Sequence, residues 1–175
     1  MSVTAEAALP TSLTINRQLF EAITSAAENS LQMAGVSAVC VGVTRSPNKK
    51  TGEVTGMIGV HGAVSGFLSV NMSEELAIQV VSGLLHERCE SLSPQVIDGS
   101  GEFANLVAGG VKASLAGGEW AFSQITIPSV IVGEGYHVAY GHGTELVEVA
   151  FEIDNPNVVR TSDRMLYVTL SLLRI

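Results

Sequence analysis

The polar side chains of residues 98–115 recur at helical spacing. On a helical wheel, one face carries Asp98, Glu102, Asn105, Gly109 and Lys112, at intervals of four, three, four and three residues. The opposite face carries the residues that we expect to pack into a core, namely Phe103, Leu106, Val107, Gly110, Val111 and Ser114. The outer face therefore offers two carboxylates, a carboxamide and an amine, which are groups that pair with polar or charged atoms of another molecule.

Gly109 leaves a gap in this outer face. Glycine costs a helix interior roughly 1 kcal/mol relative to alanine, and an outward position gives it no packing role. One explanation is close approach of the backbone of a partner protein. The simpler interpretation is a solvated face of a surface helix, and the spacing alone favours that interpretation.

The same segment resembles a known family. Asp98-Gly-Ser-Gly-Glu102-Phe-Ala-Asn105, followed by Pro128, is similar to the signature of the CheX/CheC response-regulator phosphatases. That signature is Asp or Ser, three residues, Glu, two residues, Asn, twenty-two residues and Pro, and the sequence fits every position and every gap. The resemblance is strong over about residues 90–136, and the order of elements supports it over most of the rest.

The resemblance implies a hydrolase that removes the aspartyl phosphate of a CheY-like response regulator. Asn105 would orient the attacking water, and Glu102 would pair with a lysine of the partner. In this family a divalent metal ion, Mg²⁺, belongs to the response regulator, so no cofactor is expected in this chain. These roles suit the chemistry, because phosphoryl transfer depends on positioning and charge compensation, and a carboxamide both donates and accepts hydrogen bonds.

The other motif positions are expected to have supporting roles. Asp98, Gly109 and Lys112 are assigned to partner docking. Pro128 is assigned a structural role, because proline cannot donate a hydrogen bond to a sheet and is typical of an edge or a bulge.

A second copy of the motif is not found in the first half of the sequence. Asn16, Glu21 and the pair Glu28-Asn29 do not have the required spacing. The sequence is therefore most similar to the single-motif CheX type. Members of that type are typically dimers joined by sheet pairing, so a homodimer is expected from the resemblance.

Two alternatives to an enzyme stay open. The same fold would also suit a signalling module that docks a receiver domain, or another signalling partner, without catalysis. A structural oligomerisation domain is a third and weaker hypothesis. The presence of both Glu102 and Asn105 favours the enzyme, since docking alone has little need of the asparagine.

The elements around the motif helix follow from hydrophobic periodicity and turn residues. Helices are predicted over 16–34, from the cap Ser73 to about His86, and from the cap Ser93 to 117–118. Strands are predicted over 36–44, 53–62, 64–72, 124–133, 145–153 and 165–173, with a turn at 46–52.

This order predicts an α+β fold, with helices packed on an antiparallel sheet of about six strands. Its two halves would each be a helix followed by three strands, with an extra helix between them. We expect a single domain over 14–175, preceded by a flexible N-terminal arm over 1–13.

Other kinds of site find little support. The spacing His-x-x-Cys occurs at His86 and Cys89, but no second pair completes a tetrahedral metal site. His61, His137 and His142 are interpreted as ordinary histidines. The glycine-rich segment 133–143 matches neither a Walker nor a dinucleotide-binding pattern, and the GxSxG elbow of hydrolases is missing.

Charge and hydropathy exclude two classes of partner. The net charge is −8 and no run of basic residues occurs, so neither nucleic-acid binding nor attachment to a membrane surface is expected. The sequence has no apolar run long enough to span a membrane, and its first residues do not form a signal peptide. We therefore expect a cytoplasmic protein whose two cysteines are reduced.

Overall fold

The computed structural model describes residues 14–45 and 50–174. The predicted arm, 1–13, and residues 46–49 of the predicted turn lie outside this part of the chain. The elements are, in chain order, α1 (Arg17–Met33), β1 (Ala38–Thr44), β2 (Val54–Gly62), β3 (Val64–Met72), α2 (Glu74–Leu85), α3 (Pro94–Leu115), β4 (Phe122–Ile125), β5 (Ser129–Val132), β6 (Glu145–Ile153), the 3₁₀ helix η1 (Thr161–Arg164) and β7 (Met165–Arg174).

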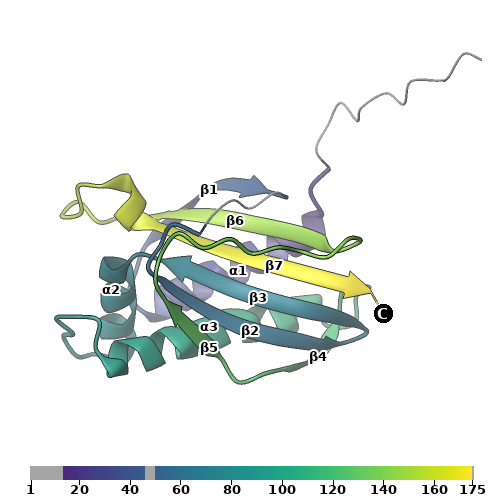
Figure 1. The fold of residues 1–175 in the computed structure, drawn as a ribbon, viewed down its shortest axis with the longest axis horizontal. Helices are drawn as coiled ribbons and strands as arrows, with labels where there is room; N and C mark the ends of the chain where they lie inside the picture. The colour runs from purple at the N-terminus through teal and green to yellow at the C-terminus, as the bar shows by residue number, and fades with distance from the viewer. Residues whose placement is uncertain (1–13, 46–49, 175) are drawn as a thin grey trace, which may run out of the picture.

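The strands form one antiparallel sheet (Figure 1). Their order is β1-β6-β7-β3-β2-β4, and β5 also pairs with β2, next to β4. Strands β2 and β3 form a hairpin in which only Ala63 separates the two strands. This confirms the α+β class and the tight hairpin that the sequence predicts.

The strand order is symmetric about the central β3–β7 pair. In this symmetry α1 corresponds to α3, β1 to β4 and β5 together, β2 to β6, and β3 to β7. Exchanging these partners gives the same strand order read in the opposite direction. Helix α2 falls between these two halves. The duplication predicted from the order of elements is thus present in the topology, although no repeat of residues accompanies it.

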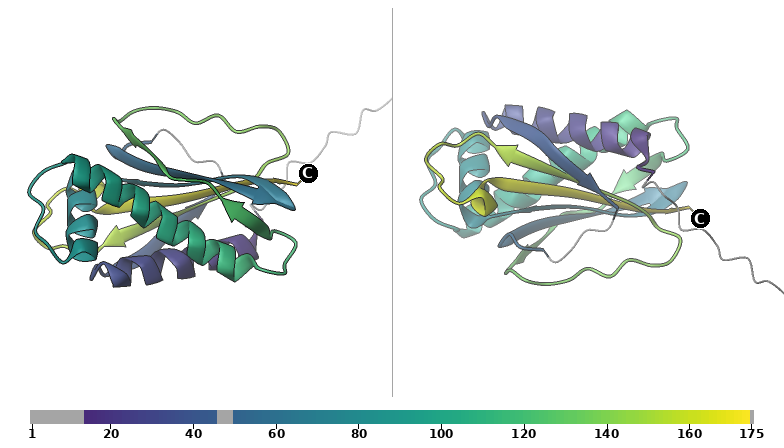
Figure 2. Two further views of the ribbon diagram at one scale, coloured as in Figure 1. Left: turned by 90° about the horizontal axis from the view of Figure 1, so that it is seen from below. Right: turned by 90° about the horizontal axis from the view of Figure 1, so that it is seen from above.

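Helices α1 and α3 run across one face of the sheet, and α2 packs against α3 at the end of the sheet (Figure 2). Alternate residues of each strand point toward them, as the two-residue period of a strand requires. One cross-strand row that is wholly buried beneath the helices consists of Ile58, Leu68, Leu170 and Val147. Fully burying such a side chain contributes about 1.5–3 kcal/mol, so this aliphatic layer holds the helices on the sheet.

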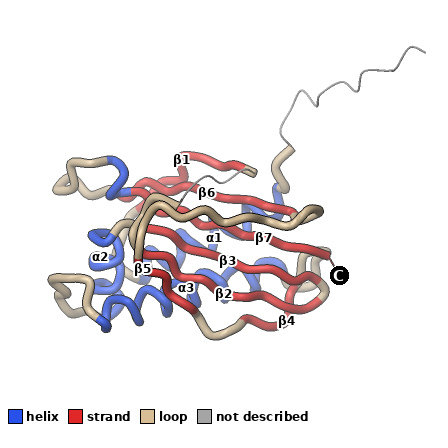
Figure 3. The backbone as a smooth tube through the Cα atoms, in the orientation of Figure 1, coloured by secondary structure: helices blue, strands red, loops and turns tan. Residues whose placement is uncertain are grey.

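The other face of the sheet is crossed by the loop between β5 and β6, residues 133–144, which is drawn in tan in Figure 3. Tyr140 of this loop stacks on Phe67 of β3, with ring centroids 5.6 Å apart. The backbone N–H of Gly135 donates to the carbonyl of Lys50, and the N–H of Lys50 donates to the carbonyl of Tyr136, both at 2.9 Å. The loop is therefore attached to the sheet and to the chain that enters β2.

Side-chain caps begin the three α-helices, at Ser73 and Ser93 as predicted. The side chains of Asn16, Ser73 and Ser93 accept hydrogen bonds at the starts of α1, α2 and α3. Gly35 follows α1 with a φ of 67°, a left-handed conformation that glycine adopts without strain.

Two predictions about the second half are wrong. The strand expected over 124–133 is divided into β4 and β5, because Pro128 has no N–H and the hydroxyl of Thr126 takes the place of a ladder contact with Gly59. The sheet consequently has seven described strands where about six were expected. Ser114, assigned to the core face of α3, is exposed, and Leu115 is the residue of this last turn that is buried in the core.

Candidate functional site

Helix α3 begins with a defined cap. The hydroxyl of Ser93 accepts a hydrogen bond from the N–H of Val96 at 3.4 Å, and Pro94 occupies the first helical position. One turn later the buried hydroxyl of Ser100 donates to the carbonyl of Val96 at 2.7 Å. The N-terminal half of the helix is therefore well defined up to the motif residues.

Glycines allow α3 to lie very close to its neighbours. A methyl group at Gly56 of β2 would lie 2.6 Å from Cβ of Ala104, and one at Gly99 would lie 2.6 Å from a methyl carbon of Val81 in α2. Carbon atoms in contact normally lie about 3.5–4.0 Å apart. The space that a side chain would need at Gly56 and Gly99 is thus already filled by atoms of Ala104 and Val81. This close packing of α3 on β2 and α2 fixes the position of the helix.

Pro128 lies against the motif helix. A methyl group at Gly101 would lie 3.4 Å from both Cβ and Cγ of Pro128 and 3.2 Å from a methyl carbon of Val130. Gly101 immediately precedes Glu102. The break between β4 and β5 is therefore in contact with the turn of α3 that carries the motif, and Pro128 stands at a sheet edge as predicted.

The motif side chains face outward from this support. Asp98 and Glu102 are exposed, and Asn105 is half-buried. Residues three apart on a helix are neighbours, with Cβ atoms roughly 5–6 Å apart, so Glu102 and Asn105 present their polar groups side by side. Among residues 14–45 and 50–174, neither side chain has a hydrogen-bond or ion-pair partner, which leaves both groups available to another molecule.

The adjacent glycines of α3 have opposite environments. Apart from the neighbouring backbone of its own helix, no described atom lies within 4 Å of a methyl group placed at Gly109, whereas one placed at Gly110 would lie 2.8 Å from Cβ of Ala26 in α1. Gly110 therefore serves the packing of α3 on α1. Gly109 has no such role in the described chain and leaves open space on the face that carries Asn105, while Lys112 is half-buried one turn from Gly109.

The remaining sequence candidates do not gather into a second site. The four histidines, His61, His86, His137 and His142, are all exposed. Cys40 and Cys89 are free thiols. Within the described residues, no group of three or more His, Cys, Asp or Glu side chains is placed to hold a metal ion. In the same part of the chain, no helix combines the length and apolar character that crossing a membrane requires.

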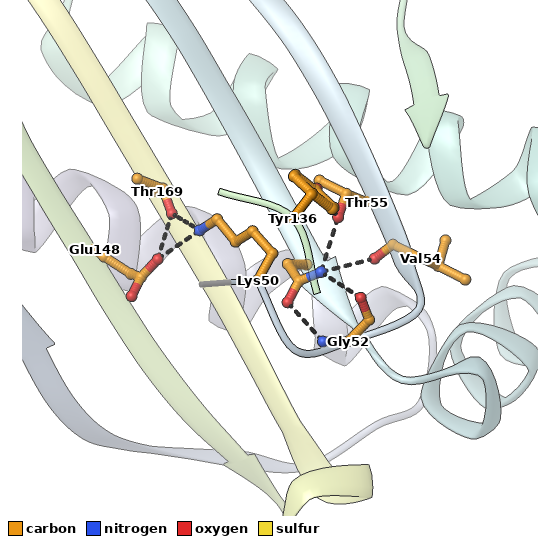
Figure 4. Close-up of polar contacts among 8 residues, drawn as sticks. Lys50, Gly52, Val54, Thr55, Tyr136, Glu148 and Thr169 are labelled. Atoms are coloured by element: carbon orange, nitrogen blue, oxygen red, sulfur yellow. Dashed lines mark hydrogen bonds and ion pairs between the residues drawn. The ribbon is translucent and has the colours of Figure 1, made fainter. Parts of the chain in front are cut away.

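A polar cluster on the opposite face of the sheet was not predicted (Figure 4). The ammonium of Lys50 donates to Oε2 of Glu148 at 2.6 Å and to Oγ1 of Thr169 at 2.7 Å, and the Thr169 hydroxyl donates to the same Glu148 oxygen at 2.7 Å. The Lys50 side chain is only 3% exposed. This ion pair is buried and shares a hydrogen bond network with Thr169, so it holds the chain before β2 on strands β6 and β7.

Asn71 joins the next part of the same cluster. Its amide nitrogen donates to the carbonyl of Gly52 at 2.9 Å and to Oγ1 of Thr55 at 2.8 Å. The hydroxyl of Tyr136 in the loop 133–144 also donates to Thr55. Figure 4 shows these groups beside the Lys50 contacts. Their contacts are satisfied within the chain, so we interpret them as attachments of loops to the sheet.

Burial raises the pKa of the tyrosine hydroxyls on this face. The pKa of Tyr140 rises to about 12 through burial first and the Glu148 carboxylate second. Burial and Glu148 also raise the pKa of Tyr167, and burial raises that of Tyr136. These hydroxyls are therefore protonated at physiological pH, and that of Tyr136 donates to Thr55.

Comparison with known families identifies the family to which the motif region is similar. Residues 54–152, which include the whole motif, match the family model described as chemotaxis phosphatase CheX. Comparison with curated protein sequences gives no match.

Three similar solved structures share low sequence identity with this chain. The chemotaxis protein CheX of Vibrio vulnificus is 23% identical, with a TM-score of 0.72 over 89% of this chain and 98% of that one. A putative chemotaxis protein of Desulfovibrio vulgaris Hildenborough is 23% identical, with a TM-score of 0.75 over 91% and 99%. The CheX of a CheX–CheY–BeF3–Mg²⁺ complex from Borrelia burgdorferi is 20% identical, with a TM-score of 0.68 over 93% and 99%. These likenesses agree with the family match, which covers more than half of the sequence. The chain belongs to the CheX family of chemotaxis phosphatases.

Proposed function

We propose that this protein hydrolyses the aspartyl phosphate of a CheY-like response regulator. The observation that carries the proposal is the pair Glu102 and Asn105, which is unpartnered among the described residues, faces outward and stands on a helix held by close backbone packing. A convex helix face cannot enclose a small substrate. It suits insertion into a concave site of another protein, where the phosphorylated side chain already lies.

In the proposed mechanism, each motif side chain has one task. The Asn105 carboxamide donates one hydrogen bond and accepts another, so it holds a water in line with the bond between phosphorus and the aspartyl oxygen. The Glu102 carboxylate pairs with a lysine of the receiver and sets the docking register. Asp98, Gly109 and Lys112 complete the docking face. Charge on the phosphoryl oxygens is compensated by that lysine and by a divalent ion, Mg²⁺, both of which the receiver supplies.

The complex from Borrelia burgdorferi supports the choice of partner, since that CheX was crystallised with CheY, BeF3 and Mg²⁺. We extend this partner to the present chain by family membership. A receiver of this kind would place the reaction in the cytoplasm.

A homodimer is proposed as well, through strand β1. This strand lies at one end of the sheet, is seven residues long, and exposes Val39, Val41 and Val43. A long apolar edge is a template for pairing with another chain unless it is covered. The opposite edge is less suited, because it is formed by two four-residue strands separated at Pro128.

The test is dephosphorylation of phosphorylated receivers from the source organism. Wild type should shorten the phosphoryl lifetime of at least one receiver. Asn105→Ala should lower the rate at saturating receiver by about 100-fold, because the water loses its positioning, and Glu102→Ala should mainly weaken binding. Glu28→Ala and Asn29→Ala serve as controls, since both residues are exposed on α1, the counterpart of α3 in the other half of the fold.

Three results would contradict parts of this proposal. If wild type binds a receiver and leaves every phosphoryl lifetime unchanged, the protein is a docking module. If it binds no receiver at all, both interpretations fail. If Asn105→Ala is as active as wild type, the reaction stands but the role of Asn105 is wrong.

A further inference from the structure

Ile127 is an aliphatic side chain presented to solvent beside the motif. Its side chain is 87% exposed, and it lies in the break between β4 and β5. This break is held in place: the N–H of Thr126 donates to the carbonyl of Gly59, and the N–H of Gly59 donates to the hydroxyl of Thr126, both at 2.9 Å. The Thr126 hydroxyl in turn donates to the carbonyl of Ile127 at 3.1 Å. Ile127 therefore projects from a fixed backbone.

The position of Ile127 follows from its neighbour. Pro128 contacts the backbone of α3 at Gly101, immediately before Glu102 and one turn before Asn105. Ile127 immediately precedes Pro128. Because consecutive Cα atoms lie about 3.8 Å apart, its backbone is next to the place where Pro128 meets α3. The exposed isoleucine thus lies at the edge of the sheet, beside the turn of α3 that carries the polar ridge, and we take this edge and that turn together as one candidate surface.

We propose that Ile127 is the hydrophobic anchor with which this surface binds the receiver domain. The inference rests on the proposed function and names a specificity residue for it. The occupant that it requires is a receiver with an apolar depression next to its phosphorylation site and its lysine. A large apolar side chain flanked by polar groups is the arrangement found at the centre of protein interfaces.

A second copy of this chain is a poorer occupant of the same surface. Two four-residue strands interrupted by proline offer few backbone groups for sheet pairing. A copy seated there would also cover Glu102 and Asn105, which have no partner among the described residues. The nearness of the β4–β5 break to that polar pair favours the receiver.

The contribution of Ile127 should appear in binding rather than in chemistry. An apolar contact made equally in the ground state and the transition state lowers the half-saturating concentration without changing the rate at saturation. Asn105 should show the reverse. This difference separates an anchor from a member of the catalytic pair.

The experiment compares Ile127→Ala and Ile127→Lys with wild type in two assays. Dephosphorylation is followed at increasing concentrations of the phosphorylated receiver, and binding is measured by calorimetry with the same receiver loaded with BeF3 and Mg²⁺. The matched control is Val159→Ala, because Val159 is 94% exposed but lies in the loop between β6 and η1, away from β4 and β5 (Figure 1).

Ile127→Ala should raise both the half-saturating concentration and Kd by about 10-fold, with the saturating rate within about twofold of wild type. Ile127→Lys should weaken binding further, and Val159→Ala should leave both quantities unchanged. If neither substitution at 127 weakens binding while wild type is active, the anchor is wrong and the phosphatase stands. A fall in the saturating rate alone also overturns the anchor. Failure of wild type to bind any receiver overturns both.

Discussion

A single added methyl group should have opposite effects on stability at two adjacent positions of α3, Gly109 and Gly110. Replacing glycine by alanine within a helix stabilises it by about 0.5–1 kcal/mol, because the unfolded chain loses conformational freedom. Both substitutions receive this gain. At Gly109 the new methyl group meets no described atom within 4 Å outside the neighbouring backbone of its own helix, so Gly109→Ala should keep the full gain.

At Gly110 the same methyl group would lie 2.8 Å from Cβ and 3.2 Å from Cα of Ala26. The latter is a backbone atom, so α1 and α3 must move apart. Overpacking of this kind costs about 1–3 kcal/mol. The propensity gain is common to both variants, and their difference therefore isolates the packing cost: Gly110→Ala should be less stable than Gly109→Ala by about 1–3 kcal/mol.

Urea denaturation followed by far-ultraviolet circular dichroism measures this difference directly. In a thermal scan, each kcal/mol should separate the two Tm values by about 2–4 °C in a protein of this size. Equal stability of the two variants would refute the close packing of α3 on α1 at Gly110. The same Gly109→Ala protein then tests the docking face: it should be more stable than wild type and yet a weaker phosphatase, because the partner must approach that bare position.

Three further substitutions test other parts of the structure. Lys50→Met should lower the free energy of unfolding by about 3–5 kcal/mol, because it leaves the Glu148 carboxylate buried without its partner. Urea denaturation measures this loss, and adding Glu148→Leu should restore most of it. A cost of Lys50→Met below about 1 kcal/mol would contradict the burial of the pair. Stability should fall as the pH rises from about 10 to about 12, since unfolded Tyr140 loses its proton near its ordinary pKa of 10.0 while the folded protein keeps it up to about 12. Tyr140→Phe should make this fall shallower in urea midpoints measured between about pH 9 and 12, and identical slopes would show that Tyr140 contributes nothing. Val41→Lys, at a 51% exposed position of β1, should yield a folded monomer in light scattering, whereas an unchanged dimer would exclude the β1 edge as the interface.

Much of the fold could be predicted from local sequence because local interactions produce it. The caps of Ser73 and Ser93 begin α2 and α3 through hydrogen bonds within one turn. The β2–β3 hairpin follows from two strand patterns with one residue between them. The strand order does not follow from local interactions. Strand β1 pairs with β6, and β3 with β7, across long stretches of chain, and no local pattern specifies those partners.

The motif helix shows the same division. Helical periodicity by itself places Glu102, Asn105 and Gly109 on one outer face, because that requires only the geometry of a helix. The helical wheel does not explain why Gly109 and Gly110 are adjacent in the sequence. Only the packing of α1 on α3 shows that Gly110 is needed for contact with Ala26 and that Gly109 is not needed for any described contact.

The Lys50–Glu148 pair marks the limit of what pattern can decide. Glu148 stands between Val147 and Val149 in an alternating strand, and alternation assigns it to the face of the sheet away from the helices. That assignment is correct, but it suggests exposure. Glu148 is buried because Lys50 and the loop 133–144 are brought over it from distant parts of the chain. The sequence alone determines which way a side chain points from its own helix or strand, and only the tertiary structure decides what lies there to meet it.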